Sequence, residues 1–565
     1  MVQPIMSGDW GPREEIASLA DELVAARFEA YPIEASLLGL PGPHHRLTDY
    51  SEQARQRTKN AVLAIARAAT AVDPTVLTEQ ERITRELIVQ QAVALAAEIE
   101  VRSEEFSVSD GLSSPALWPL VALPIITVTD GELAEGYLER LAALPRYLET
   151  MAERQRAGVE HGLAPPGFLV RGGIAYVERY LNAHHDPLRA VTPQVEVSGF
   201  EQRRDALVTD VVRPAYARYR QFLVDELLPA ARPDGQSGLW WQPEGETRYA
   251  ALIRVYTTTD RPAEELHQSG LDILDKLNAE YAALGKKVFG TTSIDEIFQR
   301  LRTDPGLRWT DGDEMLRAAR DAIVRAEKAV PSWFGHVPTN HIEVRPVPPA
   351  EASGGSTAFY TPPPLDGSRP GIYNLNVTDA QQRYRYLSEA IAFHEAIPGH
   401  HFQVTTARGL RDLPLLRRIA TVDAYDEGWA VYAERLADEM GLYTDDLARL
   451  GMLVQDSMRA ARLVVDTGLH AQGWSRERAV TFLRERTPMA PLEIEAEVDR
   501  YAAVPAQALS YMVGRLEIQR LRAGAQARLG ERFDIREFHD VLLSAGPLPM
   551  SILEQVVQDW VTGLA

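Results

Sequence analysis

The sequence predicts a mainly α-helical protein with a cleft and one small β-sheet, and three observations support this fold class. Apolar residues recur every three or four positions over most of the 565 residues, which is the spacing of amphipathic helices. β-branched and aromatic residues concentrate in three short runs that lie together after residue 340. Proline and glycine clusters divide the chain without any repeat of fixed length. We therefore expect helices almost throughout and a sheet in one place.

Two N-terminal segments show the helical pattern most clearly. They are EEIASLADELVAARFEAY (14–31) and ITRELIVQQAVALAAEIEV (83–101), in which apolar residues are spaced by three and four. The expected strands are HIEVRPV (341–347), STAFYT (356–361) and GIYNLNV (371–377), each bounded by proline or glycine.

A further helix is expected directly after the third β-like run. Thr378 followed by Gln381 is a capping-box pattern, and apolar side chains then recur at helical spacing up to His394. The segment HEAIPGHHFQ (394–403) would thus begin at the end of a well-started helix, beside the sheet.

Composition excludes several classes of function. With 59 Lys and Arg against 80 Asp and Glu, the net charge is −21, which repels nucleic acid and anionic membrane surfaces. There is no Cys, so any metal must be bound by His, Asp or Glu. The N-terminal MVQPIMSGDWGPREE resembles no export signal, and the proline-rich apolar run PALWPLVALPIITV (115–128) is too short to span a membrane. We therefore expect a cytoplasmic protein with no nucleic-acid or membrane partner.

HEAIPGHHFQ nearly matches HExxH, the signature of many zinc peptidases. In HExxH two histidines one helical turn apart bind the metal, and the Glu takes a proton from water. Here His394 and Glu395 begin the pattern, but Pro398 stands where the second His is expected. The alternative is that His394 and Glu395 make ordinary hydrogen bonds at a helix end. The strand before them and the two histidines after them favour the metal site.

Either His400 or His401 could replace the missing histidine. On an unbroken helix His400 would point about 240° away from His394, and His401 would lie about 10 Å further along, so neither could bind the same ion. Pro398 cannot donate a backbone hydrogen bond and Gly399 tolerates unusual dihedrals, so a bulge at this pair could draw one histidine inward. We favour His400 as the ligand and expect His401 to be turned toward other partners.

A third ligand is available in YDEGWAVYAERL (425–436). Glu427 and Glu434 share a helical face there, two turns apart. We expect Glu427 to bind the metal and Glu434 to orient a ligand histidine from behind. The alternatives are a first-turn carboxylate that interacts with the helix dipole for Glu427, and a solvated helix face for Glu434.

The combination of HEAIPGHHFQ, EGWAVYAE, DTGLH and PAQALSYMVG resembles a bacterial family known as domain of unknown function 885, whose hallmark is HExxPGHxxQ. The similarity covers almost the whole chain. This family resembles in turn, at a distance, the thermostable carboxypeptidase Taq group and the oligopeptidases related to thimet oligopeptidase. The resemblance implies a zincin-like helical metallopeptidase fold with a cleft, a zinc ion (Zn²⁺), Glu395 as base, and His394, His400 and Glu427 as ligands.

Other polar residues downstream are candidates for supporting roles. Tyr511 and His470 could each donate a hydrogen bond to the oxyanion that forms on an attacked carbonyl, or could be core residues with satisfied hydrogen bonds. Asp466 and His401 are expected to support the metal ligands from behind.

A second group of residues could bind substrate. Arg459 and Arg462 neighbour each other on one helix face and could bind a free carboxylate, although a solvated face is the alternative. The run GIYNLNV could pair with a substrate backbone, which makes Tyr373 and Asn376 candidate contacts.

We therefore expect residues 1–340 to form a helical region that walls the cleft and residues 341–565 to form the catalytic region. The expected function is zinc-dependent hydrolysis of short peptides, as a carboxypeptidase or an oligopeptidase. A zinc-dependent hydrolase of non-peptide amides and a non-catalytic helical binding protein are the alternatives. The substrate, and whether the protein is a monomer or a homodimer, stay open.

Overall fold

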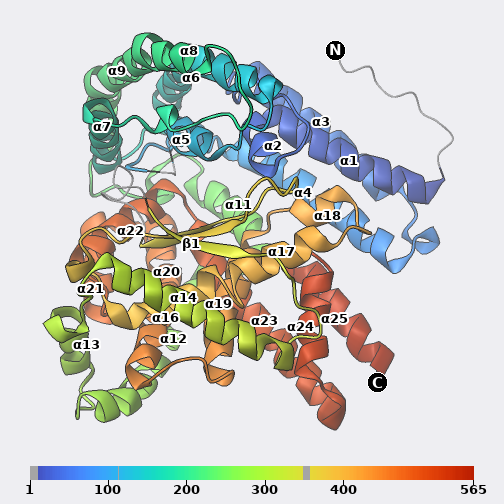
Figure 1. The fold of residues 1–565 in the computed structure, drawn as a ribbon, viewed down its shortest axis with the longest axis vertical. Helices are drawn as coiled ribbons and strands as arrows, with labels where there is room; N and C mark the ends of the chain where they lie inside the picture. Colours follow the sequence, from blue (N-terminus) through green and yellow to red (C-terminus); the bar gives the residue numbers. More distant parts are fainter. Residues whose placement is uncertain (1–10, 112–113, 348–356, 565) are drawn as a thin grey trace.

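The computed structural model describes residues 11–111, 114–347 and 357–564. Within them the protein is mainly helical with one small three-stranded sheet, so the mainly α class is confirmed (Figure 1). The first ten residues, which belong to the segment used to judge export, lie outside the described residues, as does Ser356 of the second β-like run.

The first four helices lie along the upper right of the molecule in Figure 1. They are α1 (Pro12–Ala30), α2 (Pro32–Leu38), α3 (Glu52–Ala71) and α4 (Glu79–Val101). The two segments with the clearest helical pattern are α1 and α4, and both predictions are confirmed. A capping box formed by Thr78 and Glu81 begins α4.

A second group of helices forms the upper left of the molecule and has a hydrophobic core of its own (Figure 1). It comprises α5 (Trp118–Ala122), α6 (Gly131–Glu160), α7 (Gly167–Asn182), α8 (Phe200–Leu207), α9 (Arg213–Phe222) and α10 (Leu228–Ala230). Two π-helical turns, Val208–Val212 and Leu223–Leu227, join the last three of these helices.

Most of the remaining helices form the lower part of the molecule, around the long and almost fully buried α20, whereas α11 and α18 lie at mid-height, α18 beside α4 (Figure 1). They are α11 (Gly245–Thr257), α12 (Ala263–Val288), α13 (Ile294–Thr303), α14 (Gly312–Ala329), α16 (Ser388–Glu395), α17 (His400–Gly409), α18 (Leu415–Ile419), α19 (Asp423–Glu439), α20 (Asp446–Ala471), α21 (Arg476–Arg486), α22 (Pro491–Ala503), α23 (Ser510–Leu529), α24 (Ile535–Ser544) and α25 (Met550–Leu564). Single 3₁₀ turns lie at Pro74–Val76, Ser103–Glu105, Leu123–Ile125, Pro187–Arg189, Leu239–Trp241, Pro305–Leu307, Val330–Ser332, Ala380–Gln382, Arg385–Leu387, Gln507–Leu509 and Gly530–Arg532.

The three strands match the three β-like runs and lie in the order β1-β3-β2. They are β1 (Ile342–Pro346), β2 (Ala358–Thr361) and β3 (Gly371–Leu375). β1 pairs parallel with β3, and β2 pairs antiparallel with β3. The central strand is thus β3, whose backbone is paired on both sides, so the expectation that GIYNLNV pairs with a substrate is wrong. Among the described residues, β2 lies at one edge of the sheet and packs beside α16.

Side chains from both sides of the expected domain boundary at residue 340 pack together. The division of the chain into two regions at this residue stays a prediction. The largest hydrophobic core combines residues from both sides of it, such as Leu19, Tyr373 and Trp429. Farther along, α12 lies against α20, and a Cβ atom on Gly270 would stand 2.7 Å from the Ala460 carbonyl oxygen. The N-terminal helices therefore pack directly against the region that carries the candidate site.

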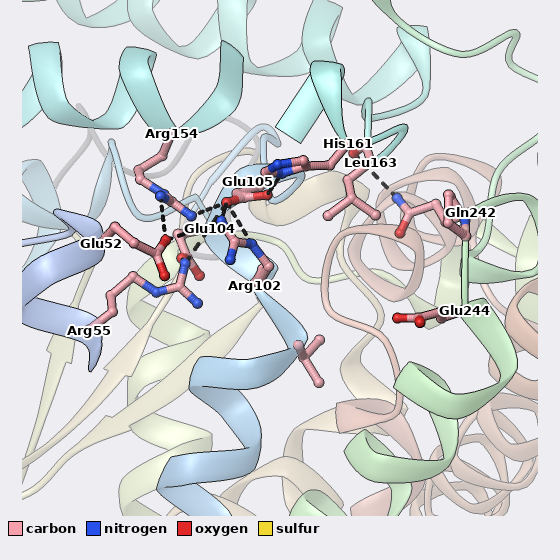
Figure 2. Close-up of polar contacts among 12 residues, drawn as sticks. Glu52, Arg55, Arg102, Glu104, Glu105, Arg154, His161, Leu163, Gln242 and Glu244 are labelled. Atoms are coloured by element: carbon pink, nitrogen blue, oxygen red, sulfur yellow. Dashed lines mark hydrogen bonds and ion pairs between the residues drawn. The ribbon is translucent and has the colours of Figure 1, made fainter. Parts of the chain in front are cut away.

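A buried ion network joins the N-terminal helices to one another (Figure 2). Its centre is the fully buried Glu105, whose carboxylate contacts the guanidinium groups of Arg102 and Arg154. Arg154 also pairs with Glu52 on α3 at 2.8 Å, and Arg55 pairs with Glu104. Because Glu105, Arg154, Arg55 and Glu104 are withdrawn from water, each depends on its partners for stabilisation.

We predict that Glu105→Gln lowers the free energy of unfolding by about 3 kcal/mol, because it leaves buried guanidinium charge without its carboxylate. The control is Glu244→Gln, in the same view of Figure 2, whose side chain is 77% exposed and pairs with Arg248 only at 3.8 Å. We expect the control to change stability by less than about 0.5 kcal/mol. Urea unfolding measures both, and equal stabilities would contradict the central role of Glu105.

Candidate metal centre

Two helices, not one, carry HEAIPGHHFQ. The first, α16, ends at Glu395, and α17 begins at His400, so the expected bulge within one helix is replaced by a complete break. The expected helix start is also wrong. The Thr378 backbone N–H donates to Asn376 Oδ1 in a turn, and two 3₁₀ turns separate it from α16.

The break at Pro398 and Gly399 is fixed by close packing. A Cβ atom on Gly399 would stand 1.9 Å from the His394 carbonyl oxygen, so only glycine fits there. The indole N–H of Trp429 on α19 donates to the Pro398 carbonyl oxygen at 2.8 Å. Glycine is needed because of this close approach, since its φ of −77° lies outside the left-handed region.

This arrangement brings three ligand atoms together. His394 Nε2 lies 3.7 Å from Glu427 Oε2, and His400 Nε2 lies 3.4 Å from the same oxygen. The ligand atoms of the three residues all lie within 4.8 Å of one another. Ligands at about 2.0–2.2 Å from a tetrahedral zinc are themselves about 3.3–3.5 Å apart, so these separations are close to those of a zinc site.

The state of Glu427 also fits a cation. Burial raises the pKa of Glu427, but the imidazoles of His394 and His400 outweigh burial and hold the pKa well below its ordinary value. Glu427 Oε2 is buried and has no hydrogen-bond partner among the described residues. The two imidazole nitrogens lie 3.7 and 3.4 Å from this oxygen, and a metal ion between the three groups would compensate its buried charge more fully.

Glu434 lies behind His394, as the helical spacing suggests. Its Oε1 is 2.8 Å from His394 Nδ1 and 3.4 Å from Arg459 Nη2, and its side chain is fully buried. Burial lowers the pKa of His394, but Glu427 and Glu434 outweigh it and raise the pKa to about 9. The contact holds the imidazole so that Nε2 faces Glu427 and His400.

Glu395, the expected base, is the last residue of α16 and is partly exposed. Beneath it lies Tyr373 of β3, whose pKa is raised by burial and by the charge of Glu395. Tyr373 is fully buried in the hydrophobic core, which puts it out of reach of a substrate, contrary to expectation. Asn376 is fully buried too, and its Oδ1 accepts the Thr378 N–H, so it stabilises a turn and does not face a substrate.

His401 turns away from the metal centre and joins α17 to the sheet. Burial lowers the pKa of His401, so the imidazole is neutral near pH 7. Its Nε2 lies 3.0 Å from the Asn340 carbonyl oxygen and donates to it, and its Nδ1 accepts from the Tyr360 hydroxyl at 2.9 Å. A Cβ atom on Gly371 would stand 2.7 Å from this Nδ1, so glycine begins β3. His401 therefore supports the position of α17 and does not contact a ligand directly.

Tyr511 lies close to Glu427 because α19 and α23 approach closely. A Cβ atom on Gly428 would stand 2.5 Å from Gly514, which sets this approach. Burial and the charge of Glu427 raise the pKa of Tyr511. The Arg462 guanidinium lies over the Tyr511 ring, 4.4 Å from its centroid. Tyr511 therefore stays a candidate donor beside the metal centre.

His470 does not belong to the site. Its Nδ1 accepts the Leu239 N–H and its Nε2 lies against the Tyr501 carbonyl oxygen, both at 3.0 Å. Burial lowers the pKa of His470 to about 3. Because the backbone uses both ring nitrogens, the expected oxyanion contact is wrong for His470.

Asp466 also has partners outside the site. It accepts from the Tyr249 hydroxyl at 2.5 Å and from the Ala506 N–H at 3.0 Å. It therefore ties α11 to the turn before α23, and the expected support of a metal ligand is not observed.

Arg459 and Arg462 are buried on α20, so the solvated face is wrong, whereas the substrate role stays a prediction. Arg459 contacts Gln455 and Glu434, and Arg462 pairs with Glu497 Oε2 at 2.8 Å. A substrate carboxylate would have to displace these partners.

One acidic residue near the centre was missed. Asp423 lies one turn before Glu427 on α19 and accepts from Gln507 Nε2 at 3.4 Å. Burial and the charge of Glu427 raise the pKa of Asp423 to about 6. Its spacing of four residues from Glu427 is the signal in the sequence from which it could have been identified.

Comparison with known families identifies the group of proteins to which this site belongs. The family described as bacterial protein of unknown function (DUF885) matches residues 32–557. The chain belongs to the DUF885 family. The family resemblance expected from the motifs is thereby confirmed, whereas the more distant relationship to carboxypeptidase Taq stays a prediction. No curated protein matches the chain.

Two solved structures share the fold of this DUF885 protein. A "putative lipoprotein" from Colwellia psychrerythraea is 28% identical with a TM-score of 0.89, and the match covers 98% of this chain and 100% of that one. A "putative lipoprotein of unknown function" from Shewanella oneidensis is 19% identical with a TM-score of 0.72, over 96% and 99% of the two chains.

These descriptions contradict the expected cytoplasmic location, because lipoproteins are attached to membranes. The expectation relied on the N-terminal composition and on the lack of an apolar run long enough to span a membrane. None of the helices in the described part of the chain has the length and apolar character needed to cross a membrane.

We predict that Gly399→Ala displaces α17 from α16, because its Cβ would collide with the His394 carbonyl oxygen. The variant should lose most zinc uptake and unfold at a lower temperature than the wild type. Gly409→Ala at the other end of α17 is the matched control, since its Cβ would meet nothing within 4 Å. Metal analysis after dialysis with zinc and thermal unfolding measure both effects, and a Gly399→Ala variant that binds zinc normally would contradict this account of the helix break.

We also predict that Asp466 makes stability fall as the pH rises. Burial raises the pKa of Asp466 to about 7, despite hydrogen bonds from Tyr249 and Ala506. The folded protein therefore retains a proton that the unfolded chain releases near pH 4. The stabilisation is complete below that pH and declines by up to about 1.4 kcal/mol per pH unit until pH 7. Asp466→Asn should remove this component from urea unfolding curves recorded between pH 5 and 8; an unchanged slope would show that Asp466 ionises normally.

Proposed function

We propose that this DUF885 protein is a zinc-dependent hydrolase of short peptides with a zincin-like site. The observation that carries the proposal is the convergence of His394 Nε2, His400 Nε2 and Glu427 Oε2, with Glu395 beside His394. Three protein ligands of this kind leave one position open, which is the arrangement of catalytic rather than structural zinc sites.

Zinc held by these residues would polarise the substrate carbonyl and lower the pKa of a water molecule. The residues of the chain supply the proton transfers. The Glu395 carboxylate would accept a proton from the attacking water and then donate it to the nitrogen of the leaving amine. Glu395 suits this because it ends a helix at the metal centre and is partly exposed, so water and substrate can reach it.

One further feature supports hydrolysis of a carbonyl compound. Tyr511, near Glu427, could donate its hydroxyl hydrogen bond to the oxyanion, which is the role left open by His470. Because both structural relatives are described as putative lipoproteins, action at a membrane surface is part of the proposal.

Metal content and turnover test the proposal together. The purified protein should bind about one zinc per chain, and His394→Ala and His400→Ala should each lose it, whereas His401→Ala should keep it. Glu395→Gln should keep the zinc but hydrolyse short peptides about 10²–10⁴-fold more slowly. Mass spectrometry of peptide digests and elemental analysis provide the measurements.

Three results would count against this function. If the wild type takes up no zinc, the alternative of a non-catalytic binding protein is favoured. Full activity of Glu395→Gln would mean that another group takes the proton. Cleavage of acylated amino acids but of no peptide in the panel would favour the hydrolase of non-peptide amides.

A further inference from the structure

A cavity among the described residues lies between helices α1, α2 and α4 and the site-bearing region. Its volume is about 290 Å³, at the lower end of the range for small-molecule sites. Helices α1, α2, α4, α17 and α18 and the end of β2 line it. Most of its wall is apolar, formed by side chains such as Leu23, Phe28, Leu95, Leu416 and Ile419.

The charged groups in this cavity are mostly arginines. Arg27, Arg369 and Arg408 line it, and Glu34 is the single carboxylate among the described residues of the wall. Arg27 and Glu34 neutralise each other through two hydrogen bonds of 2.7 and 3.0 Å. Two guanidinium charges therefore stay without a carboxylate in the wall, in a protein whose net charge is −21.

Among the described residues, the side chains of Arg369 and Arg408 bond only to backbone carbonyls. Arg408 donates to the Pro363 carbonyl oxygen, and Arg369 donates to that of Pro370 at 3.2 Å. Burial lowers the pKa of Arg408 to about 10, and the charge of Arg369 lowers it further. Burial and the charge of Arg345 lower the pKa of Arg369. The exposed Asp366 offsets this only in part for Arg369. The positive charges of Arg369 and Arg408 would therefore be stabilised by a bound anion.

The pair is linked through Tyr360 on β2 to α17, the helix that begins with His400. Burial raises the pKa of Tyr360, and the charges of Arg408 and Arg369 lower it, so both guanidinium groups are its neighbours. The Tyr360 hydroxyl contacts His401, the residue after the ligand His400. Along α17, Arg408 is eight residues beyond His400, which is about 12 Å at the helical rise. An extended peptide covers this distance in about three or four residues.

We propose that the cavity holds the apolar C-terminal end of a short peptide, with its free carboxylate bound by Arg369 and Arg408. This inference rests on the proposed peptidase function and narrows it, because the carboxylate lies about three residues from the scissile bond. The enzyme would then release short C-terminal fragments rather than single residues. Arg369 and Arg408 take the role that the sequence suggested for the buried Arg459 and Arg462.

Binding to the Glu395→Gln variant tests the proposal without turnover. The probe is an N-acetylated tetrapeptide that ends in two leucines, with either a free or an amidated C-terminus, measured by isothermal titration calorimetry. The free acid should bind about 10- to 100-fold more tightly than the amide, because charge-assisted hydrogen bonds are lost with the charge. Adding Arg369→Gln or Arg408→Gln should weaken the acid to the affinity of the amide and leave the amide unchanged.

Variants control for damage to the fold. Arg411→Gln removes an exposed arginine just beyond α17 and should not alter binding. If Arg408→Gln lowers the unfolding temperature, two other variants still test carboxylate binding. Arg369→Gln should lose the preference for the free acid over the amide, and the charge-preserving Arg408→Lys should retain part of it.

Other outcomes would overturn the proposal. Equal affinity for acid and amide would exclude carboxylate recognition in the cavity. If an amidated peptide with a glutamate side chain binds as tightly as the free-acid peptide, the cavity recognises acidic side chains. If decanoate binds in an arginine-dependent way and peptides do not bind, the cavity is a fatty-acid site. Failure of the proposed function appears separately, as a wild type that binds no zinc and cleaves nothing, whatever the calorimetry shows. In an active enzyme, release of single C-terminal residues would contradict the expected spacing.

Discussion

The close approach of the Gly399 backbone to the His394 carbonyl is the constraint on which the candidate site depends. In an HExxH helix a single turn aligns two histidines, whereas here the chain leaves one helix and enters another within four residues. The ring centroids of His394 and His400 end 4.8 Å apart with their planes at 86°. The helix that supplies Glu427 also supplies Trp429, which holds the carbonyl of Pro398. One helix therefore fixes both the third ligand and the turn that positions the second.

The same helix arranges carboxylates whose surroundings differ over short distances. Asp423, Glu427 and Glu434 follow one face of α19. Burial and a like charge raise the pKa of Asp423, two imidazoles lower the pKa of Glu427, and Glu434 is compensated by His394 and Arg459. A divalent cation at Glu427 would reduce the mutual repulsion along this face. The clustering of shifted groups at one place is the usual mark of a functional site.

Local patterns in the sequence identified the elements, but not how distant elements meet. Helical spacing located α1 and α4, and β-branched runs located the three strands, because these patterns reflect short-range geometry. The strand order depends on pairing between distant segments, which a local pattern does not contain. For this reason the sequence suggested that GIYNLNV could pair with a substrate, although β3 is the central strand.

The candidate site divides in the same way. The ligand set followed from HExxPGH and from spacing on α19, both of which are local. The contacts of His470, Arg459 and Arg462 could not be predicted, because α20 is buried on nearly all sides. The partners of its polar residues come from three other helices, α11, α19 and α22. A helix without a solvent face offers no pattern that separates a ligand-binding polar residue from a structural one. The arginines of the cavity were missed for a related reason, since Arg369 lies in a loop and Arg408 at a helix end.

The net charge of −21 and the two cavity arginines affect an acidic ligand at different distances. Together they limit which ligands can enter the cavity. At physiological ionic strength the field of surface charges is screened beyond about 8 Å, so the negative surface disfavours acidic ligands mainly during approach. Inside an apolar cavity screening is weak, and Arg369 and Arg408 attract a carboxylate strongly at contact. A ligand with many acidic groups would meet repulsion at each of them and gain from only one. In the proposed peptidase, this arrangement would favour short peptides whose single carboxylate is at the end and whose remaining residues are neutral or apolar.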